Sequence, residues 1–259
     1  MAYCKTETRG RVLHVTIDRP KVMNALHPPA HRDLADAFDR FAGDPELWVA
    51  VITGAGDRAF CAGSDLKHMA SAAPGQGDAT PESGFAGLTQ RFGMNKPIIA
   101  MVNGLALGGG LEIALACDLV IAADHATFGF PEPKVGLAAM GGGLHRLARQ
   151  IPLKQAMGLA LTGRTIDAVE ARSLGIVNEA VPSSALEATT QRWVEMILSC
   201  APLAVQATKS VMMDSLDHAS LIAAIGHEYP AARRMLDSRD AEEGPRAFAE
   251  HRSPSWQGR

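Results

Sequence analysis

Residues 97–116 read PIIAMVNGLALGGGLEIALA, and this stretch decides much of the fold. The apolar run at 98–102 predicts a buried strand that ends in a turn. A helix is expected to begin near the glycines at 108–110, and its body at 111–116 is apolar except for Glu112. The stretch therefore predicts a strand, a turn and a core helix with one carboxylate in its first turn.

The glycines at the start of this helix favour close approach of a ligand to the backbone. A helix N-terminus presents unpaired N–H groups and the positive end of the helix dipole, and glycine places no Cβ in the way of a ligand carbonyl. This arrangement is half of an oxyanion hole. The alternative interpretation is that Glu112 is an ordinary first-turn carboxylate that caps the helix or complements its dipole, an effect of about 0.3–1 kcal/mol.

A second glutamate lies in residues 127–133, TFGFPEP, where prolines on both sides of Glu132 restrict the backbone. An ordinary surface turn is the alternative interpretation. A third stretch, RAFCAGSDLK at 58–67, follows an apolar strand predicted at 49–53 and supplies another small-residue turn that enters a helix. The three stretches together indicate chemistry at a carbonyl group.

Together these stretches resemble the crotonase superfamily, the enoyl-CoA hydratase/isomerase proteins, and the likeness extends along nearly the whole chain. Further matching motifs, in the family's order and spacing, are RPKVMNAL at 19–26, LTGR at 161–164 and EGPRAFAE at 243–250. The motifs GFAGLT at 84–89 and PSWQGR at 254–259 look like the carnitinyl-CoA dehydratase branch. Ser64 departs from that branch, which usually has a bulky aromatic residue after Cys-Ala-Gly.

The resemblance implies a role for each matching position. The backbone N–H groups of Ser64 and Gly109 correspond to the two donors of the oxyanion hole. Glu112 and Glu132 correspond to the two catalytic glutamates. Further positions expected to contact the acyl-CoA substrate are Ala62, Asp65, Leu66, Lys67 and Pro131. For the phosphates of coenzyme A, Lys67 and Arg58 are the local candidates, and the alternative for both is a solvated surface charge.

Possession of both glutamates favours hydration of a 2-enoyl-CoA, because adding water to the double bond requires a base for the water and an acid for the α-carbon. We predict an enoyl-CoA hydratase in which Glu132 protonates carbon and Glu112 activates the water, with one proton shared between them. The alternatives are carnitinyl-CoA dehydratase-like or enoyl-CoA isomerase activity, and a non-enzymatic acyl-CoA-binding or assembly protein. No metal and no permanently bound cofactor are expected, because coenzyme A arrives as part of the substrate.

The bulk composition narrows the class of protein. The 259 residues are 47% hydrophobic and carry a net charge of −3, without a basic stripe, which argues against nucleic acid as a partner. No stretch offers about 20 consecutive apolar residues and the N-terminus lacks an apolar signal core, so we expect a cytoplasmic protein without a membrane partner. The four cysteines have neither metal nor redox spacing and are expected to be reduced.

Strand signals recur along the first two thirds of the chain, at 12–18, 49–53, 98–102 and 119–122. They alternate with helical stretches, which is the pattern of a layered α/β fold. The resemblance implies a crotonase-type spiral of repeated ββα units. We expect this core, with the acyl-CoA site, to occupy residues 1–182.

Residues 183–259 are predicted to form a helical region, with helices at 186–198, 203–213 and 219–236. The resemblance implies that this region makes oligomer contacts, in a homotrimer or a dimer of trimers. Residues 70–84, rich in alanine, glycine, serine and proline, are expected to form a mobile cover over the acyl pocket.

Overall fold

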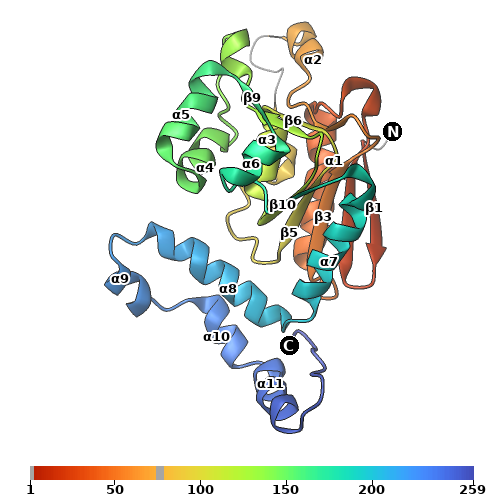
Figure 1. The fold of residues 1–259 in the computed structure, drawn as a ribbon. Helices are drawn as coiled ribbons and strands as arrows, with labels where there is room; N and C mark the ends of the chain where they lie inside the picture. The colour runs from red at the N-terminus through yellow and green to blue at the C-terminus, as the bar shows by residue number, and fades with distance from the viewer. Residues whose placement is uncertain (1–2, 74–78) are drawn as a thin grey trace.

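The computed structural model describes residues 3–73 and 79–259. Residues 74–78, within the stretch 70–84 that the sequence predicts to cover the acyl pocket, lie outside the described residues. The described chain forms two sheets surrounded by helices, and the last helices project to one side of this core (Figure 1).

The larger sheet has six strands in the order β1-β2-β3-β5-β7-β10. Its members are β1 (Cys4–Arg9), β2 (Val12–Ile17), β3 (Val49–Gly54), β5 (Ile98–Val102), β7 (Leu119–Ala123) and β10 (Glu179–Val181). The pair β1 and β2 is an antiparallel hairpin, and the other pairings are parallel. Parallel strands are covered on both faces, which explains why β3, β5 and β7 are nearly continuous apolar runs.

The smaller sheet has four strands in the order β4-β6-β8-β9. Its members are β4 (Ala59–Cys61), β6 (Leu105–Leu107), β8 (Thr127–Gly129) and β9 (Thr165–Asp167). Three consecutive strand pairs, β3–β4, β5–β6 and β7–β8, each place one strand in the larger sheet and the next in the smaller one. Helical segments follow these pairs: α2 (Leu66–Ser71), α3 (Gly109–Ala116) and the 3-10 helix η3 (Glu132–Val135). The predicted spiral of ββα units is confirmed.

The remaining helices of the core are α1 (Pro28–Gly43), α4 (Gly143–Gln150), α5 (Leu153–Thr162) and α6 (Ala168–Ser173). In α1, Leu34, Phe38 and Phe41 repeat at helical spacing and are completely buried, so one face of this helix packs on the core. Seven of the eight residues of α3, including Glu112, are buried. The apolar body of α3 therefore carries a carboxylate into the interior.

Every described element after β10 is helical. These elements include α7 (Leu186–Leu198), α8 (Pro202–Asp214), α9 (Leu221–Gly226), α10 (Pro230–Leu236) and α11 (Arg239–Ala249). The prediction of a single helix at 219–236 is wrong, because the chain forms two helices, α9 and α10, with a break before Pro230. Pro230 has no N–H to donate, and it favours the extended conformation that Tyr229 adopts. No single helix within 3–73 and 79–259 is long and apolar enough to cross a membrane, although Ser183–Leu198 and Pro202–Asp217, bent by 99°, pass that test together.

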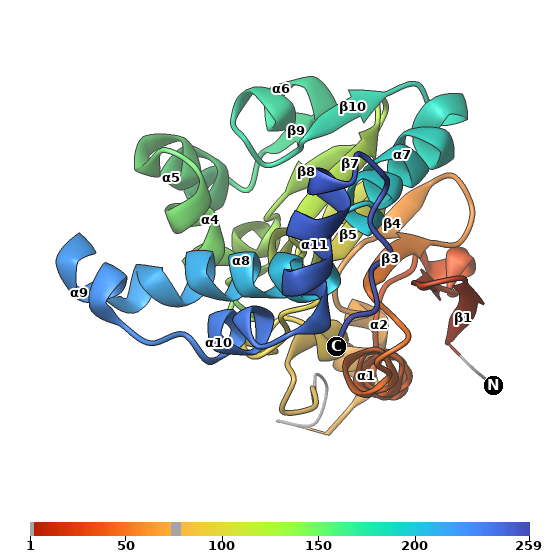
Figure 2. The same cartoon turned by 90° about the horizontal axis from the view of Figure 1, so that it is seen from below.

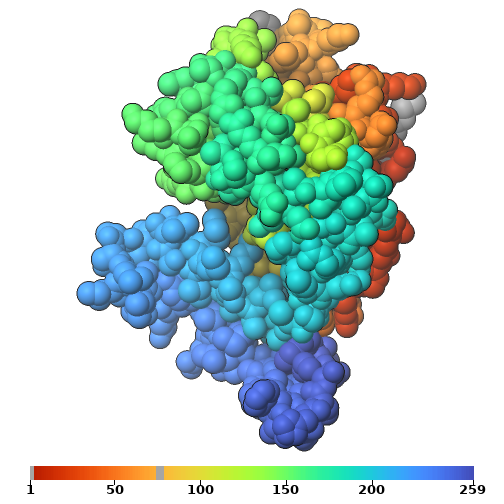
Figure 3. Space-filling view, in the orientation of Figure 1, coloured from red at the N-terminus to blue at the C-terminus, as the bar shows by residue number. Residues whose placement is uncertain are grey.

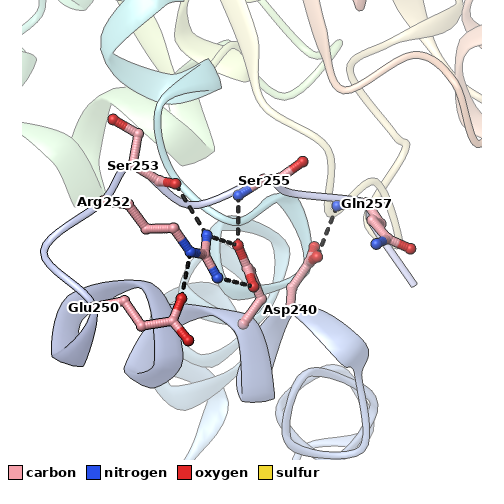
Figure 4. A network of polar contacts seen from close by, with 7 residues as sticks. Asp240, Glu250, Arg252, Ser253, Ser255 and Gln257 are labelled. Carbon is pink, nitrogen blue, oxygen red and sulfur yellow. Dashed lines mark hydrogen bonds and ion pairs between the residues drawn. The ribbon is translucent and has the colours of Figure 1, made fainter.

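The end of the chain folds back over α11 toward the core (Figures 2 and 4). Buried Asp240 accepts hydrogen bonds from the backbone N–H groups of Gln257 at 2.7 Å and Gly258 at 2.8 Å. The Trp256 indole donates to the Ser199 carbonyl, directly after α7, at 2.8 Å. These contacts tie α11 to the end of α7.

Candidate active site

Three segments meet at one edge of the smaller sheet. Strands β4, β6 and β8 are parallel neighbours, so their carboxyl ends lie side by side. The turn with Ser64 follows β4, the N-terminus of α3 follows β6, and Glu132 follows β8. The topology therefore brings together the three stretches from which the sequence predicted a site.

The two turns that carry the predicted oxyanion donors are in direct contact. Gly63 has φ +92°, and a Cβ placed on it would lie only 3.1 Å from the Gly109 nitrogen. Gly109 is the first residue of α3, so its N–H has no acceptor within the helix. Leu26 forms a bridge with the turn after β4: its N–H donates to the Gly63 carbonyl, and its carbonyl accepts from the Asp65 N–H. The Ser64 N–H, which lies between these two bonds, therefore points away from Leu26.

The carboxylate of Glu112 is held by a second glycine run, at residues 141–143. Its Oε1 accepts a hydrogen bond from the Gly143 N–H at 2.9 Å. A Cβ on Gly141 would lie 2.4 Å from Oε2, so this turn presses closely on the carboxylate. The N-cap of α3 is Gly108, and the bond to Gly143 leads away from α3, which does not fit the capping interpretation. Sequence reasoning missed this run, although its glycines before a helix repeat the pattern at 108–110.

Glu132 begins the helix η3 and directs its side chain to the start of α3. A Cβ on Gly108 would lie 2.8 Å from Glu132 Oε1. The other oxygen, Oε2, is buried and has no hydrogen-bond partner among the residues that the structure describes. Burial raises the pKa of Glu132 above its ordinary value, and the nearby charge of Glu112 raises it further. The site thus pairs a hydrogen-bonded carboxyl with one whose protonated form is favoured.

The raised pKa of Glu132 predicts a pH-dependent cost to stability. The folded protein binds this proton more tightly than the unfolded chain, so the contribution to stability falls as pH rises through the folded-state pKa. Glu132→Gln should therefore raise the free energy of unfolding at pH 7, with a gain that shrinks as the pH is lowered toward the ordinary glutamate range. Urea denaturation across this range measures it, with the exposed Glu187→Gln as control. A variant less stable than wild type at every pH would contradict the prediction.

The other predicted contact residues lie around the same edge. The Ala62 N–H is bonded to the Met23 carbonyl at 3.0 Å, and Pro131 is the N-cap of η3. Leu66 and Lys67, like Arg58, are exposed. Asp65 instead has structural partners. It caps α2 by accepting a hydrogen bond from the His68 N–H at 3.2 Å, and it forms an ion pair with Arg19 at 3.0 Å.

One wall behind the glutamates contains a cation that the sequence did not reveal. Arg146 on α4 donates to the Thr89 carbonyl at 2.7 Å. Burial lowers the pKa of Arg146, and the charge of Glu112 opposes this effect. The guanidinium and the carboxylate therefore interact electrostatically. The segment that ends at Thr89 is thereby linked to the surroundings of Glu112.

The described residues contain no group of three or more histidine, cysteine or acidic side chains that is able to hold a metal ion. Cys61 lies beside the site, but burial raises the pKa of its thiol to about 12, so it stays protonated and packs as a small side chain. The chemistry available from the described residues is therefore that of two carboxyl groups and two backbone N–H donors.

Comparisons with known proteins identify the family of the chain. The model of the enoyl-CoA hydratase/isomerase family matches residues 7–259. Carnitinyl-CoA dehydratase of Proteus mirabilis is 42% identical over 258 residues, which cover 97% of each chain. The crystal structure of enoyl-CoA hydratase from Mycobacterium tuberculosis H37Rv matches with a TM-score of 0.92 at 42% identity. The crystal structure of carnitinyl-CoA hydratase from Mycobacterium avium matches with a TM-score of 0.77 at 43% identity. Both matches cover 100% of this chain and 100% of the other chain. The resemblance read from the motifs is confirmed, and the chain belongs to the enoyl-CoA hydratase/isomerase family.

Proposed function

We propose that this protein is an enoyl-CoA hydratase that adds water reversibly to a 2-enoyl-CoA thioester. The observation that carries the proposal is the position of the Glu132 carboxyl. One of its oxygens lies over the start of α3, and the other is buried without a partner among the described residues. A half-buried carboxyl that has one such oxygen and a raised pKa is suited to hold a proton and deliver it to a substrate atom.

In the proposed reaction, the thioester oxygen accepts hydrogen bonds from the N–H groups of Ser64 and Gly109. The Glu112 carboxylate takes a proton from water as the water oxygen bonds to the β-carbon. The electrons of the double bond move toward the thioester and form an enolate, which the two N–H donors stabilise by about 2.7–4 kcal/mol each. Protonated Glu132 then delivers its proton to the α-carbon. One water has been added, and the single proton shared by the pair has moved from Glu132 to Glu112.

The proposed substrate is an acyl-CoA. Coenzyme A is part of this substrate and is not a separately bound cofactor. We assign contacts with it to the segments that follow β4 and β8, namely Ala62, Leu66, Lys67 and Pro131. Leu66 is half-exposed beside the oxyanion turn, as expected for an apolar side chain that a ligand covers. The ion pair of Asp65 with Arg19 limits its proposed role to fixing α2 and the Ser64 turn.

A second candidate is carnitinyl-CoA dehydratase activity, favoured by the identity to the Proteus mirabilis relative and by the motif at 84–89. Ser64 departs from that branch, because its side chain is smaller than the bulky aromatic residue that is usual there. The two activities share the same general acid–base chemistry, so the glutamates do not distinguish them. The two activities differ in the acyl group of the substrate.

The test follows loss of the conjugated enoyl-thioester absorbance with crotonyl-CoA and crotonobetainyl-CoA. Turnover of crotonyl-CoA supports the hydratase, and turnover of crotonobetainyl-CoA alone assigns the protein to the carnitine branch. Shift of the double bond in 3-hexenoyl-CoA without water addition identifies an isomerase. Tight binding of these thioesters without turnover by folded wild type supports an acyl-CoA-binding protein and refutes both proposed activities.

We also infer that the residues after 182 form an oligomer contact, in a trimer or a dimer of trimers of a cytoplasmic enzyme. Helices α8 to α11, residues 202–249, project from the core as an arm (Figure 3). Large apolar side chains that the arm exposes are Met212, Met213, Leu216, Leu221, Ile222, Ile225, Leu236 and Phe248. Exposed apolar side chains gathered on one segment mark an interface rather than a solvent face.

Placing a charge on this arm is expected to dissociate the assembly. Ile222 is 86% exposed, so Ile222→Asp should not disturb the fold of one chain, but it would bury a carboxylate in the proposed interface. Sedimentation velocity should give three or six times the chain mass of 27.4 kDa for wild type and a smaller mass for the variant. Val169→Asp, on the exposed side of α6, is the matched control. A monomeric wild type would refute the inference.

A further inference from the structure

The 3-10 helix η2 (Phe85–Gly87) bridges two elements that are far apart in the sequence, α1 and α3. Its central residue, Ala86, has φ +55° and ψ +18°, a left-handed conformation that alanine rarely adopts. Such a backbone persists only where its surroundings fix it. The contacts around η2 therefore identify what holds it.

One of these contacts comes from a histidine in the interior. His31 on α1 is completely buried, and its Nδ1 accepts a hydrogen bond from the Ala86 N–H at 3.0 Å. The proton of the ring consequently lies on Nε2. The His31 ring also meets the Phe85 ring edge to face, with centroids 4.5 Å apart and planes at 68°. A single side chain thus fixes the strained residue and the aromatic ring before it.

The Phe85 ring in turn packs against the first residue of α3. A Cβ placed on Gly109 would lie 2.3 Å from Phe85 Cζ, so the ring rests directly on the Gly109 Cα. Phe85 is buried, and its own N–H is bonded to Thr89 Oγ1 at 3.0 Å. Displacement of this ring would release the peptide that carries the Gly109 N–H.

We propose that His31 is a positioning residue for the oxyanion hole: through Ala86 and Phe85 it fixes the direction of the Gly109 N–H. This inference rests on the proposed function, in which Gly109 is one of the two oxyanion donors. His31 does not touch the substrate. The part of His31 that matters is the hydrogen-bond acceptor at Nδ1. An apolar side chain of similar size would fill the same space but would leave the Ala86 N–H without this acceptor.

The test compares His31→Leu, which removes the acceptor, with His31→Asn, whose Oδ1 occupies nearly the position of Nδ1. The matched control is Phe41→Leu, which disturbs a fully buried residue about 15 Å farther along the same helix. Each variant is measured for kcat and KM with crotonyl-CoA, for melting temperature, and for the absorbance shift of bound 4-dimethylaminocinnamoyl-CoA. That shift reports polarisation of the thioester carbonyl by the oxyanion donors.

His31→Leu is expected to lower kcat by up to about 10²-fold with little change in KM, because the lost alignment matters most in the transition state. It should also reduce the absorbance shift. His31→Asn should retain most of both, and Phe41→Leu should lower only the melting temperature. Normal kcat and absorbance shift in His31→Leu, or an equal loss in Phe41→Leu, would overturn the proposal. A wild type that binds the probe without any shift would instead refute the oxyanion hole itself, and the inference with it.

Discussion

Glu112→Gln and Glu132→Gln are each expected to reduce kcat with crotonyl-CoA by about 10²–10⁴-fold, the usual contribution of a general acid or base. Glutamine preserves the shape of either side chain and removes its ability to transfer a proton. In Glu112→Gln the amide oxygen still accepts from the Gly143 N–H, so the turn at 141–143 should stay in place. The double variant should lose little more activity than the less active single variant, because the two groups act as one unit in the addition of water.

The controls for these variants separate chemistry from helix stability. Glu187, like Glu112, lies in the first turn of a helix, but its side chain is 81% exposed. If Glu112 only complements the dipole of α3, then Glu112→Gln and Glu187→Gln should both cost about 0.3–1 kcal/mol of stability and leave kcat unchanged. Thermal melts and stopped-flow absorbance on the same samples measure both quantities. A fully active Glu112→Gln enzyme would contradict the proposed mechanism.

The sequence predicted four strands of the larger sheet because each contains enough apolar residues in succession to stand out from a loop, whereas β1 and α1 were not placed. Strands β2, β3, β5 and β7 have five or six mostly apolar residues, and their positions were predicted within a residue or two. The strands of the smaller sheet have three residues each, too few for an alternating pattern to emerge from a loop. These short strands nevertheless align the turns that carry the site.

The two glutamates and the glycine turns were accessible from sequence because each lies in a local motif. The groups that hold them in place were not, because their partners are distant in the chain. The Gly143 N–H meets Glu112 across 31 positions, and the Ala86 N–H meets His31 across 55. Neither contact has a local signature: a buried histidine and a glycine before a helix have many ordinary explanations. Only the fold brings these pairs together.

The close approach of α3 to the turn after β4 predicts a large effect of one methyl group. A Cβ on Gly110 would lie 1.9 Å from the Cys61 carbonyl oxygen, a backbone atom that cannot rotate away. Helix propensity alone favours alanine over glycine by about 1 kcal/mol. Steric overlap should outweigh this, because the helix and the turn must separate and carry the Gly109 and Ser64 N–H groups out of alignment.

Gly110→Ala is therefore expected to lower kcat by about 10²-fold or more and to cost about 1–3 kcal/mol of stability. Gly158→Ala is the matched control, since Gly158 lies inside α5 and a Cβ there meets no atom within 4 Å. That variant should keep full activity and gain about 0.4–1 kcal/mol. Steady-state kinetics and urea denaturation of both variants check the prediction. Wild-type kcat in Gly110→Ala would show that the alignment of the two backbone donors tolerates movement, and the oxyanion hole would then lose its place in the mechanism.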